Sequence, residues 1–263
     1  ACTNRRLPVI NYVVSDRTAT ITIDDEARRN PLSNEAMAEL AEAVSRSAAD
    51  PGVSVVVITG AGERAFSAGG DLSSGFVDSP LPDHQSRGAL AELFKSIRGN
   101  PKPVIARVNG VALGGGFGLA VVCDITIAVS GARMGTPEIG LGLWPMMISA
   151  ALVRSMPRKP LMEMMLTGRV VTAEEALEYG LVSRVVPRER LDVELAEVVA
   201  GILTRSPAAI ALGKRSFYAI DDMDFETALD HLHAGLTAVS LTEDASEGVD
   251  AFLQKRDPKW RGR

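Results

Sequence analysis

The chain has 263 residues, of which 46% are hydrophobic, and this length and composition predict one or two globular domains with a sizeable core. The formal net charge is −5 and the basic residues are scattered, which argues against a nucleic-acid-binding surface and favours a small organic substrate. The two cysteines, Cys2 and Cys123, lie far apart in the sequence, so neither a disulfide framework nor a cysteine-ligated metal site is expected.

Apolar runs bounded by turn residues predict alternating strands and helices along the first 200 residues. Strands are expected, in chain order, at 9–14, 18–23, 53–59, 104–108, 125–129, 132–134 and 182–186. Ser33 is expected to cap a helix whose apolar positions recur at Ala36, Met37, Leu40 and Val44. A second helix is expected at 90–98. The longest uncharged stretch, 108–123, is shorter than the ~20 residues of a membrane span, so no membrane segment is expected.

From Leu191 onward the pattern is almost entirely helical. Further helix starts are expected at 206–207, 223–224 and 242–243, before a polar tail at 255–263. We therefore expect a core domain at 1–200 and a helical subdomain at 201–263, which packs on the core or on a neighbouring subunit. Residues 1–8 lack the apolar segment of a secretory signal, so a cytoplasmic location is expected.

Two glycine-rich turns are the most informative feature of the sequence. Residues 66–72 (FSAGGDL) and 109–118 (NGVALGGGFG) each follow an apolar run that is predicted to be a buried strand. Ligands of open α/β sheets bind at the carboxyl ends of such strands, and glycine lets a ligand approach the main chain closely. Gly115 is expected to open a helix that runs to Val122. We therefore predict that backbone N–H groups of the two turns bind one anionic oxygen.

Several other motifs lack the context that their usual functions require. The GAGERA sequence at 60–65 matches a dinucleotide-binding pattern, but no helix is expected to open there. The GKRS sequence at 213–216 lacks the earlier glycine of a phosphate-binding loop. His231 and His233 point to different faces of a helix and do not form a metal pair, and no nucleophile elbow surrounds Ser67. No metal site is expected.

One carboxylate stands out among the remaining charged residues. Glu138 directly follows a short predicted strand, in a loop that contains three glycines and a proline. A carboxylate in tight apolar surroundings is costly unless it is paired or used in chemistry. The spacing alone leaves open a solvated turn acid as the alternative.

Taken together, these motifs resemble the crotonase, or enoyl-CoA hydratase/isomerase, superfamily. The resemblance covers nearly the whole chain and depends on the order and spacing of its segments, which are FSAGGDL at 66–72, NGVALGGG at 109–116, CDI at 123–125, PEIGLG at 137–142, LTGR at 166–169, EALEYGLV at 175–182 and EGVDAFL at 247–253. It implies an α/β fold, built as a spiral of ββα units with two roughly perpendicular sheets and trailing C-terminal helices. It also implies a homotrimer, or a hexamer made of two trimers.

The resemblance further implies an acyl-CoA thioester as the substrate and no separate cofactor. By position, the oxyanion hole falls on the N–H groups of Gly70 and Gly115, and Glu138 falls on the acid/base that handles the proton at the α-carbon. Acyl-CoA contacts are expected from Ala68, Gly69, Asp71, Leu72 and Gly114. Trp144, with Met146 and Met147, either shapes the acyl pocket or packs in the core. The CoA phosphates are expected to meet basic residues, for which the candidates are Arg28, Arg29, Lys259 and Arg261.

The chain departs from the hydratase pattern at one position. Hydratases of this superfamily carry a second glutamate twenty residues before the first, where this chain has Gly118. Asp71 or Asp124 is conceivable as a substitute, although the family pattern gives neither that role. A single glutamate favours double-bond isomerisation over two-acid hydration. The alternatives are a catalytically weak acyl-CoA-binding protein and a CoA-thioester hydrolase on the same fold.

Overall fold

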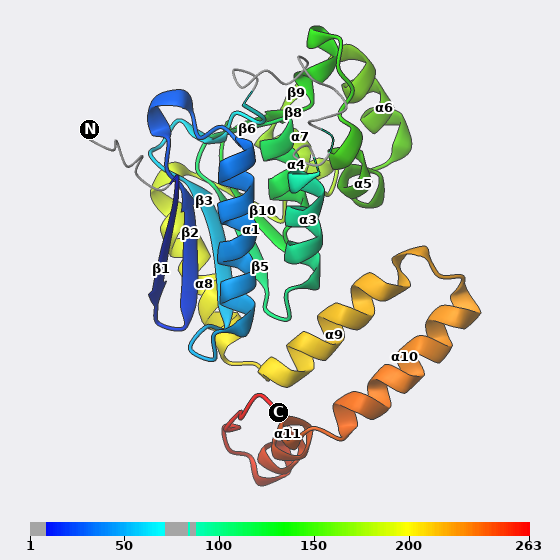
Figure 1. Cartoon of the computed structure of the whole chain (residues 1–263). Helices are drawn as coiled ribbons and strands as arrows, with labels where there is room; N and C mark the ends of the chain where they lie inside the picture. The colour runs from blue at the N-terminus through cyan, green and yellow to red at the C-terminus, as the bar shows by residue number, and fades with distance from the viewer. Residues whose placement is uncertain (1–8, 72–83, 85–87) are drawn as a thin grey trace.

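The computed structural model describes residues 9–71, 84 and 88–263, and it contains two β-sheets with helices packed around them (Figure 1). The larger sheet has the strand order β1-β2-β3-β5-β7-β10 and the smaller one β4-β6-β8-β9. The strands of the larger sheet are β1 (Ile10–Ser15), β2 (Thr18–Ile23), β3 (Val55–Gly60), β5 (Val104–Val108), β7 (Ile125–Val129) and β10 (Arg184–Val186). Those of the smaller sheet are β4 (Ala65–Ser67), β6 (Val111–Leu113), β8 (Arg133–Gly135) and β9 (Val170–Thr172).

The larger sheet places the ends of β3 and β5 side by side. These two strands pair in parallel, with Thr59 opposite Arg107. Every residue of β3 is buried, as expected for a strand covered on both faces. β1 and β2 form an antiparallel pair at the edge of this sheet, and β10 is at the other edge. The chain segments that lead to the two glycine-rich turns therefore leave the sheet next to each other.

The smaller sheet corrects the sequence prediction for the segments between those strands and the turns. Phe66 and Ser67, which were predicted to belong to a turn, form part of β4, and residues 111–113 form β6. β4 pairs in parallel with β6, and β6 pairs in parallel with β8. β4 and β6 have three residues each and lie inside the glycine-rich segments, so side-chain alternation did not reveal them, whereas the short strand expected at 132–134 is found as β8.

Helices cover the sheets and contribute to a common apolar core. They are α1 (Asn34–Ala49), α3 (Ala89–Gly99), α4 (Gly115–Val122), α5 (Met146–Ser155), α6 (Arg158–Thr167) and α7 (Ala173–Glu178). Helix α4 has the predicted bounds, and six of its eight residues are buried because it packs against β5, β6, α3 and α5. Short 3-10 turns lie at η1 (Glu26–Arg28), η3 (Pro137–Leu141), η4 (Arg188–Arg190) and η5 (Ile220–Asp222).

The C-terminal part of the chain is helical, with α8 (Leu191–Leu203), α9 (Pro207–Ala219), α10 (Phe225–Ser240) and α11 (Glu243–Gln254). Side-chain caps mark the helix starts that the sequence predicted: Ser33, Ser206, Asp224 and Thr242 each accept a hydrogen bond from the first turn of the following helix. Figure 1 shows α9 and α10 running side by side, with α11 and the C-terminus at the end of the pair where α9 begins and α10 ends. No residue of α10 is buried.

Among the described residues, no single helix is both long and apolar enough to cross a membrane. One pair, 188–203 with 207–222, meets the length and composition criteria only when its two helices are counted together across a bend of 103°.

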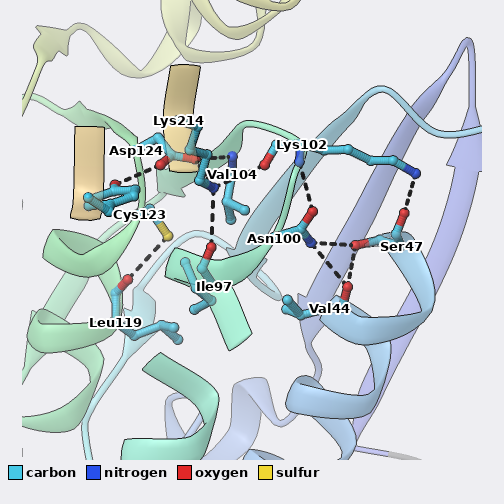
Figure 2. Close-up of polar contacts among 11 residues, drawn as sticks. Val44, Ser47, Ile97, Asn100, Lys102, Val104, Leu119, Cys123, Asp124 and Lys214 are labelled. Carbon is cyan, nitrogen blue, oxygen red and sulfur yellow. Dashed lines mark hydrogen bonds and ion pairs between the residues drawn. The ribbon is translucent and has the colours of Figure 1, made fainter. Parts of the chain in front are cut away.

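Asp124 connects helix α9 to the core of the fold. Figure 2 shows its carboxylate accepting hydrogen bonds from the Lys214 ammonium at 2.6 Å and from the Val104 N–H at 2.6 Å. The hydroxyl of Tyr218 donates to the other carboxylate oxygen at 2.7 Å. Lys214 also donates to the carbonyls of Ile97 and Lys102, so one buried ammonium joins α9 to the end of α3 and the start of β5.

Candidate active site

The first glycine-rich turn is aligned by a short segment of chain at 29–32. The Leu32 N–H donates to the Gly69 carbonyl at 2.7 Å, and the Asp71 N–H donates to the Leu32 carbonyl at 3.2 Å. This pattern is a parallel bridge between Leu32 and Gly70. Because Leu32 binds the residues on both sides of Gly70, the N–H of Gly70 itself points away from Leu32.

The second turn begins at Gly114 and leads directly into helix α4. Gly114 has φ +51°, and its N–H donates to the Gly135 carbonyl at 2.9 Å. The N–H of Gly115 belongs to the first turn of α4, where amide groups have no partner within the helix. Within the described residues, no backbone hydrogen bond is donated by the N–H of Gly70 or Gly115. Both donors are thus available to a ligand, and that of Gly115 adds the positive end of a helix dipole.

The two turns lie against each other at these amides. A Cβ atom built on Gly115 would lie 3.9 Å from the Gly70 nitrogen, and one built on Gly69 would lie 3.5 Å from the Gly115 nitrogen. Gly69 also has φ +96°, and its Cβ would lie only 2.7 Å from the Leu113 carbonyl oxygen. Glycine at this position is what allows the two turns to approach so closely.

Glu138 lies beside the second turn. It is in η3, and a Cβ atom built on Gly114 would lie 3.0 Å from its Oε1. Its Oε2 is buried and has no hydrogen-bond partner among the described residues. Burial raises the pKa of this carboxyl above its ordinary value of 4.5, and the residue's own backbone N–H opposes that shift in part. A half-buried carboxyl with one buried, unpartnered oxygen and a raised pKa is suited to take up and return a proton.

The position of the missing second acid is filled by hydrocarbon. A Cβ atom on Gly118 would lie 2.3 Å from Cγ2 and 2.7 Å from Cβ of Ile148, and 2.9 Å from Cζ of Phe94. Gly118 therefore lets α5 and α3 pack closely on α4, and the described residues leave no room there for a glutamate side chain. Sequence comparison with the hydratase pattern indicated the absence of the acid, but only the structure identifies what replaces it.

The two aspartates considered as substitutes are both engaged elsewhere. Asp71 accepts a hydrogen bond from Arg28 at 2.9 Å and takes part in a further interaction. Asp124 follows the C-terminal end of α4, and at a rise of ~1.5 Å per residue it lies ~13 Å along the helix from Gly115. Its oxygens bind Lys214, Tyr218 and the Val104 N–H. Asp124 is therefore too far along α4 to assist Glu138, and one Asp71 oxygen is bound by Arg28.

The remaining predicted contact residues are distributed around the turns. Ala68 and Gly70 are exposed, Gly69 is buried, and Leu72 lies outside the described residues. Trp144 is half-buried and packs against the core, as does Met147, whereas Met146 is exposed. Among the proposed phosphate ligands, Arg28 borders the first turn through Asp71. Lys259 and Arg261 lie in the C-terminal tail beside α11, far from β6 and β8 in the same chain (Figure 1).

Sequence reasoning missed the 29–32 segment that aligns Gly70. Its signals were present: Asn30-Pro31 is a dipeptide typical of turns, and asparagine tolerates left-handed backbone. In the structure Arg29 and Asn30 have φ values of +66° and +55°. The dipeptide marks a bend in the chain, but it does not indicate which distant segment that bend supports.

Comparison with known proteins identifies the family of this chain. Residues 14–263 match the family model described as "Enoyl-CoA hydratase/isomerase". The chain is 36% identical over 249 residues to the 2,3-dehydroadipyl-CoA hydratase of Escherichia coli, covering 94% of this chain and 96% of that one. It is also 36% identical over 249 residues to the carnitinyl-CoA dehydratase of Salmonella enteritidis, covering 91% and 93%.

A solved structure shows the same fold. The enoyl-CoA hydratase of Mycobacterium smegmatis superposes with a TM-score of 0.93 at 34% identity, over 97% of this chain and 99% of that one. The spiral architecture with two sheets and C-terminal helices is thereby confirmed. This chain belongs to the enoyl-CoA hydratase/isomerase family of the crotonase superfamily.

Proposed function

We propose that this enzyme moves a carbon–carbon double bond in an acyl-CoA thioester through an enolate. In the proposed reaction the carboxylate of Glu138 removes a proton from C2 of a 3-enoyl thioester. The electron pair shifts onto the carbonyl oxygen, which the N–H groups of Gly70 and Gly115 bind. The protonated Glu138 then delivers a proton to C4, and the double bond ends between C2 and C3, so no atom is gained or lost overall.

The observation that carries this proposal is the hydrocarbon packing at Gly118. Addition of water by the two-acid mechanism needs a second carboxyl group to orient and activate the water. The Ile148 side chain fills that position, with its Cγ2 2.3 Å from where the first side-chain carbon would lie. Transfer of one proton between two carbons needs only one carboxyl group, and Glu138 supplies it.

The magnitudes expected of the site are large enough for catalysis. One preorganised donor to an oxyanion is worth ~3 kcal/mol, or a factor of ~10² to 10³ in rate. A positioned acid/base contributes a further factor of ~10² to 10⁴. The donors proposed here are main-chain groups, and among the described residues they have no competing backbone acceptor.

Product analysis tests the proposal directly. The enzyme is incubated separately with 2-enoyl-CoA and 3-enoyl-CoA thioesters, and the products are examined by mass spectrometry and by chromatography against both isomers. We expect unchanged mass with a shifted double bond. A gain of 18 Da, the mass of water, with no isomerisation would refute the isomerase assignment and indicate a hydratase.

The Glu138→Gln variant tests the assigned acid/base. The amide has nearly the same shape as the carboxyl but cannot take up the proton, so turnover should fall by ~10² to 10⁴ while acyl-CoA binding persists. Full activity in this variant would remove Glu138 from the mechanism.

A catalytically weak acyl-CoA-binding protein is the second candidate, and the absence of the second acid favours it. Exchange of α-protons separates the two. The proposed enzyme should exchange the C2 protons of a bound acyl-CoA with deuterated water, whereas a binding protein should not. Thioester hydrolysis is excluded if no free coenzyme A accumulates in the same samples.

A cytoplasmic location stays a prediction. We further propose that the enzyme assembles as a trimer or as a hexamer of two trimers. The support for assembly is the apolar surface of the C-terminal helices. Phe225, Leu236, Leu241 and Phe252 are each more than half exposed in the single chain. Contiguous exposed apolar surface is typical of protein–protein interfaces. Light scattering on the purified protein measures the assembly size.

A further inference from the structure

Two buried asparagines hold the loop that precedes the first glycine-rich turn. Asn30 and Asn109 are each 0% exposed, and they come from segments 79 positions apart in the sequence. The Asn30 amide nitrogen donates to the carbonyls of Ala61 at 3.0 Å and Ala65 at 2.8 Å. The Asn109 amide nitrogen donates to the same Ala65 carbonyl at 3.2 Å. Ala65 is thus bound by both side chains at the first residue of β4.

Asn109 makes further contacts with this loop. Its amide nitrogen also donates to the carbonyls of Gly60 at 3.0 Å and Gly62 at 2.7 Å. Its amide oxygen accepts from the Gly60 N–H at 3.3 Å. The oxygen of Asn30 accepts from the Asp25 N–H at 3.0 Å. Both side chains therefore use donor and acceptor groups fully, as buried amides in a rigid network do.

Each asparagine lies close in the sequence to a segment that positions one of the two proposed oxyanion-hole donors. Asn30 belongs to the 29–32 segment, which pairs with residues 68–71 and sets the direction of the Gly70 N–H. Asn109 precedes β6, which leads through Gly114 to the Gly115 N–H. The Ala65 carbonyl is the point at which these two supports meet. Through this one oxygen the two amides connect the segments that carry the two donors.

We propose that Asn30 and Asn109 are positioning residues, which fix the distance between the Gly70 and Gly115 donors without touching the substrate. This inference rests on the proposed oxyanion chemistry. A misplacement of about 1 Å costs on the order of 10²-fold in rate, because donor geometry decides how strongly the developing charge is stabilised. Loss of either asparagine should therefore lower kcat much more than it changes KM.

Asn100 provides a matched control. It is also buried, at 2% exposure, and its amide nitrogen donates to the Val44 carbonyl and to the Ser47 hydroxyl (Figure 2). It lies before β5, whereas Asn109 lies after it, so the two amides are at opposite ends of the same strand. Replacing either one by alanine leaves buried carbonyls unsatisfied, but only Asn109 is joined to the turns.

The test compares Asn109→Ala and Asn30→Ala with Asn100→Ala. Butyryl-CoA with a ¹³C-labelled carbonyl serves as the probe, because a saturated thioester binds without isomerising. The infrared carbonyl frequency of the bound probe reports the strength of the two N–H donors. We expect a lowered frequency in the wild type and in Asn100→Ala, and a return toward the free value in Asn109→Ala and Asn30→Ala. For these last two variants kcat on 3-enoyl-CoA should fall by about 10²-fold with KM changed little.

The possible outcomes distinguish the proposed oxyanion hole from the proposed positioning role of the two asparagines. A wild-type enzyme that binds the probe without lowering its carbonyl frequency would overturn both the oxyanion hole and the positioning role. A lowered frequency that is the same in wild type and Asn109→Ala would overturn only the positioning role, as would an equal effect of Asn100→Ala. If Asn109→Ala does not fold, Asn109→Ser, which keeps one donor and one acceptor, carries the same comparison.

Discussion

The packing at Gly118 can be measured by adding and removing single methyl groups. In Gly118→Ala the new Cβ would lie 2.3 Å from Cγ2 of Ile148 and 2.9 Å from Cζ of Phe94, distances that real side chains do not adopt. Overpacking of this kind costs typically ~1–3 kcal/mol. Alanine gains ~1 kcal/mol over glycine within a helix, so the expected net loss in the free energy of unfolding is ~0–2 kcal/mol.

A double-mutant cycle tests whether contact with Ile148 causes the destabilisation of Gly118→Ala. Ile148 is 2% exposed, so Ile148→Ala alone should cost ~2–5 kcal/mol. It removes Cγ2, so the pair Gly118→Ala with Ile148→Ala should be less destabilised than the sum of the singles by ~1 kcal/mol or more. Ile148→Val is the control, because valine retains a carbon at the Cγ2 position and should relieve nothing.

Urea unfolding at one fixed protein concentration measures all of these variants. If the m-values stay constant, the midpoints give the coupling energy directly. Additive effects of Gly118→Ala and Ile148→Ala, within ~0.3–0.5 kcal/mol, would refute the packing explanation for the missing acid.

Two further predictions concern the proposed site. Gly70→Ala should fold with a stability close to that of Gly99→Ala, because a Cβ atom at either position meets no described atom within 4 Å. The Gly70 variant should nevertheless weaken acyl-CoA binding and turnover. Normal kinetics in Gly70→Ala would show that no ligand approaches the turn there. Glu138→Gln should raise the thermal midpoint at neutral pH, because the raised pKa of Glu138 means that the folded chain holds this proton more tightly than the unfolded chain. The stability contributed by the protonated carboxyl is present below pH 4.5 and is lost as the pH rises through the folded pKa. The difference in thermal midpoint between Glu138→Gln and the wild type should therefore shrink toward pH 4. A difference in thermal midpoint that does not change with pH would contradict the raised pKa.

The sequence predicted those parts of the fold that carry a local signal. Side-chain caps at Ser33, Ser206 and Thr242 lie where the pattern indicated, and α4 has its predicted bounds. These features depend on a few consecutive residues. The three-residue strands β4 and β6 depend instead on pairing between segments more than 40 residues apart, which a single sequence does not reveal.

The candidate site divides in the same way. Glycine patterns and the family resemblance indicated Gly70, Gly115 and Glu138, because glycine and an isolated acid are conspicuous in a sequence. The aligning role of Leu32 could not be predicted, because it acts through main-chain atoms and any residue but proline has the same N–H group. The filling of the Gly118 position by Ile148 likewise results from two helices packing together, which no spacing rule encodes.

The main-chain and side-chain groups of the proposed site respond differently to mutation. The groups proposed to bind the carbonyl are amides that every substitution except proline preserves, so ordinary point mutations alter them only through the shape of the turns. The proposed proton transfer, by contrast, depends on the side chain of Glu138 in the five-residue 3-10 turn η3. New reactions on this scaffold can therefore arise by exchanging one or two side chains while the main-chain contribution is inherited intact.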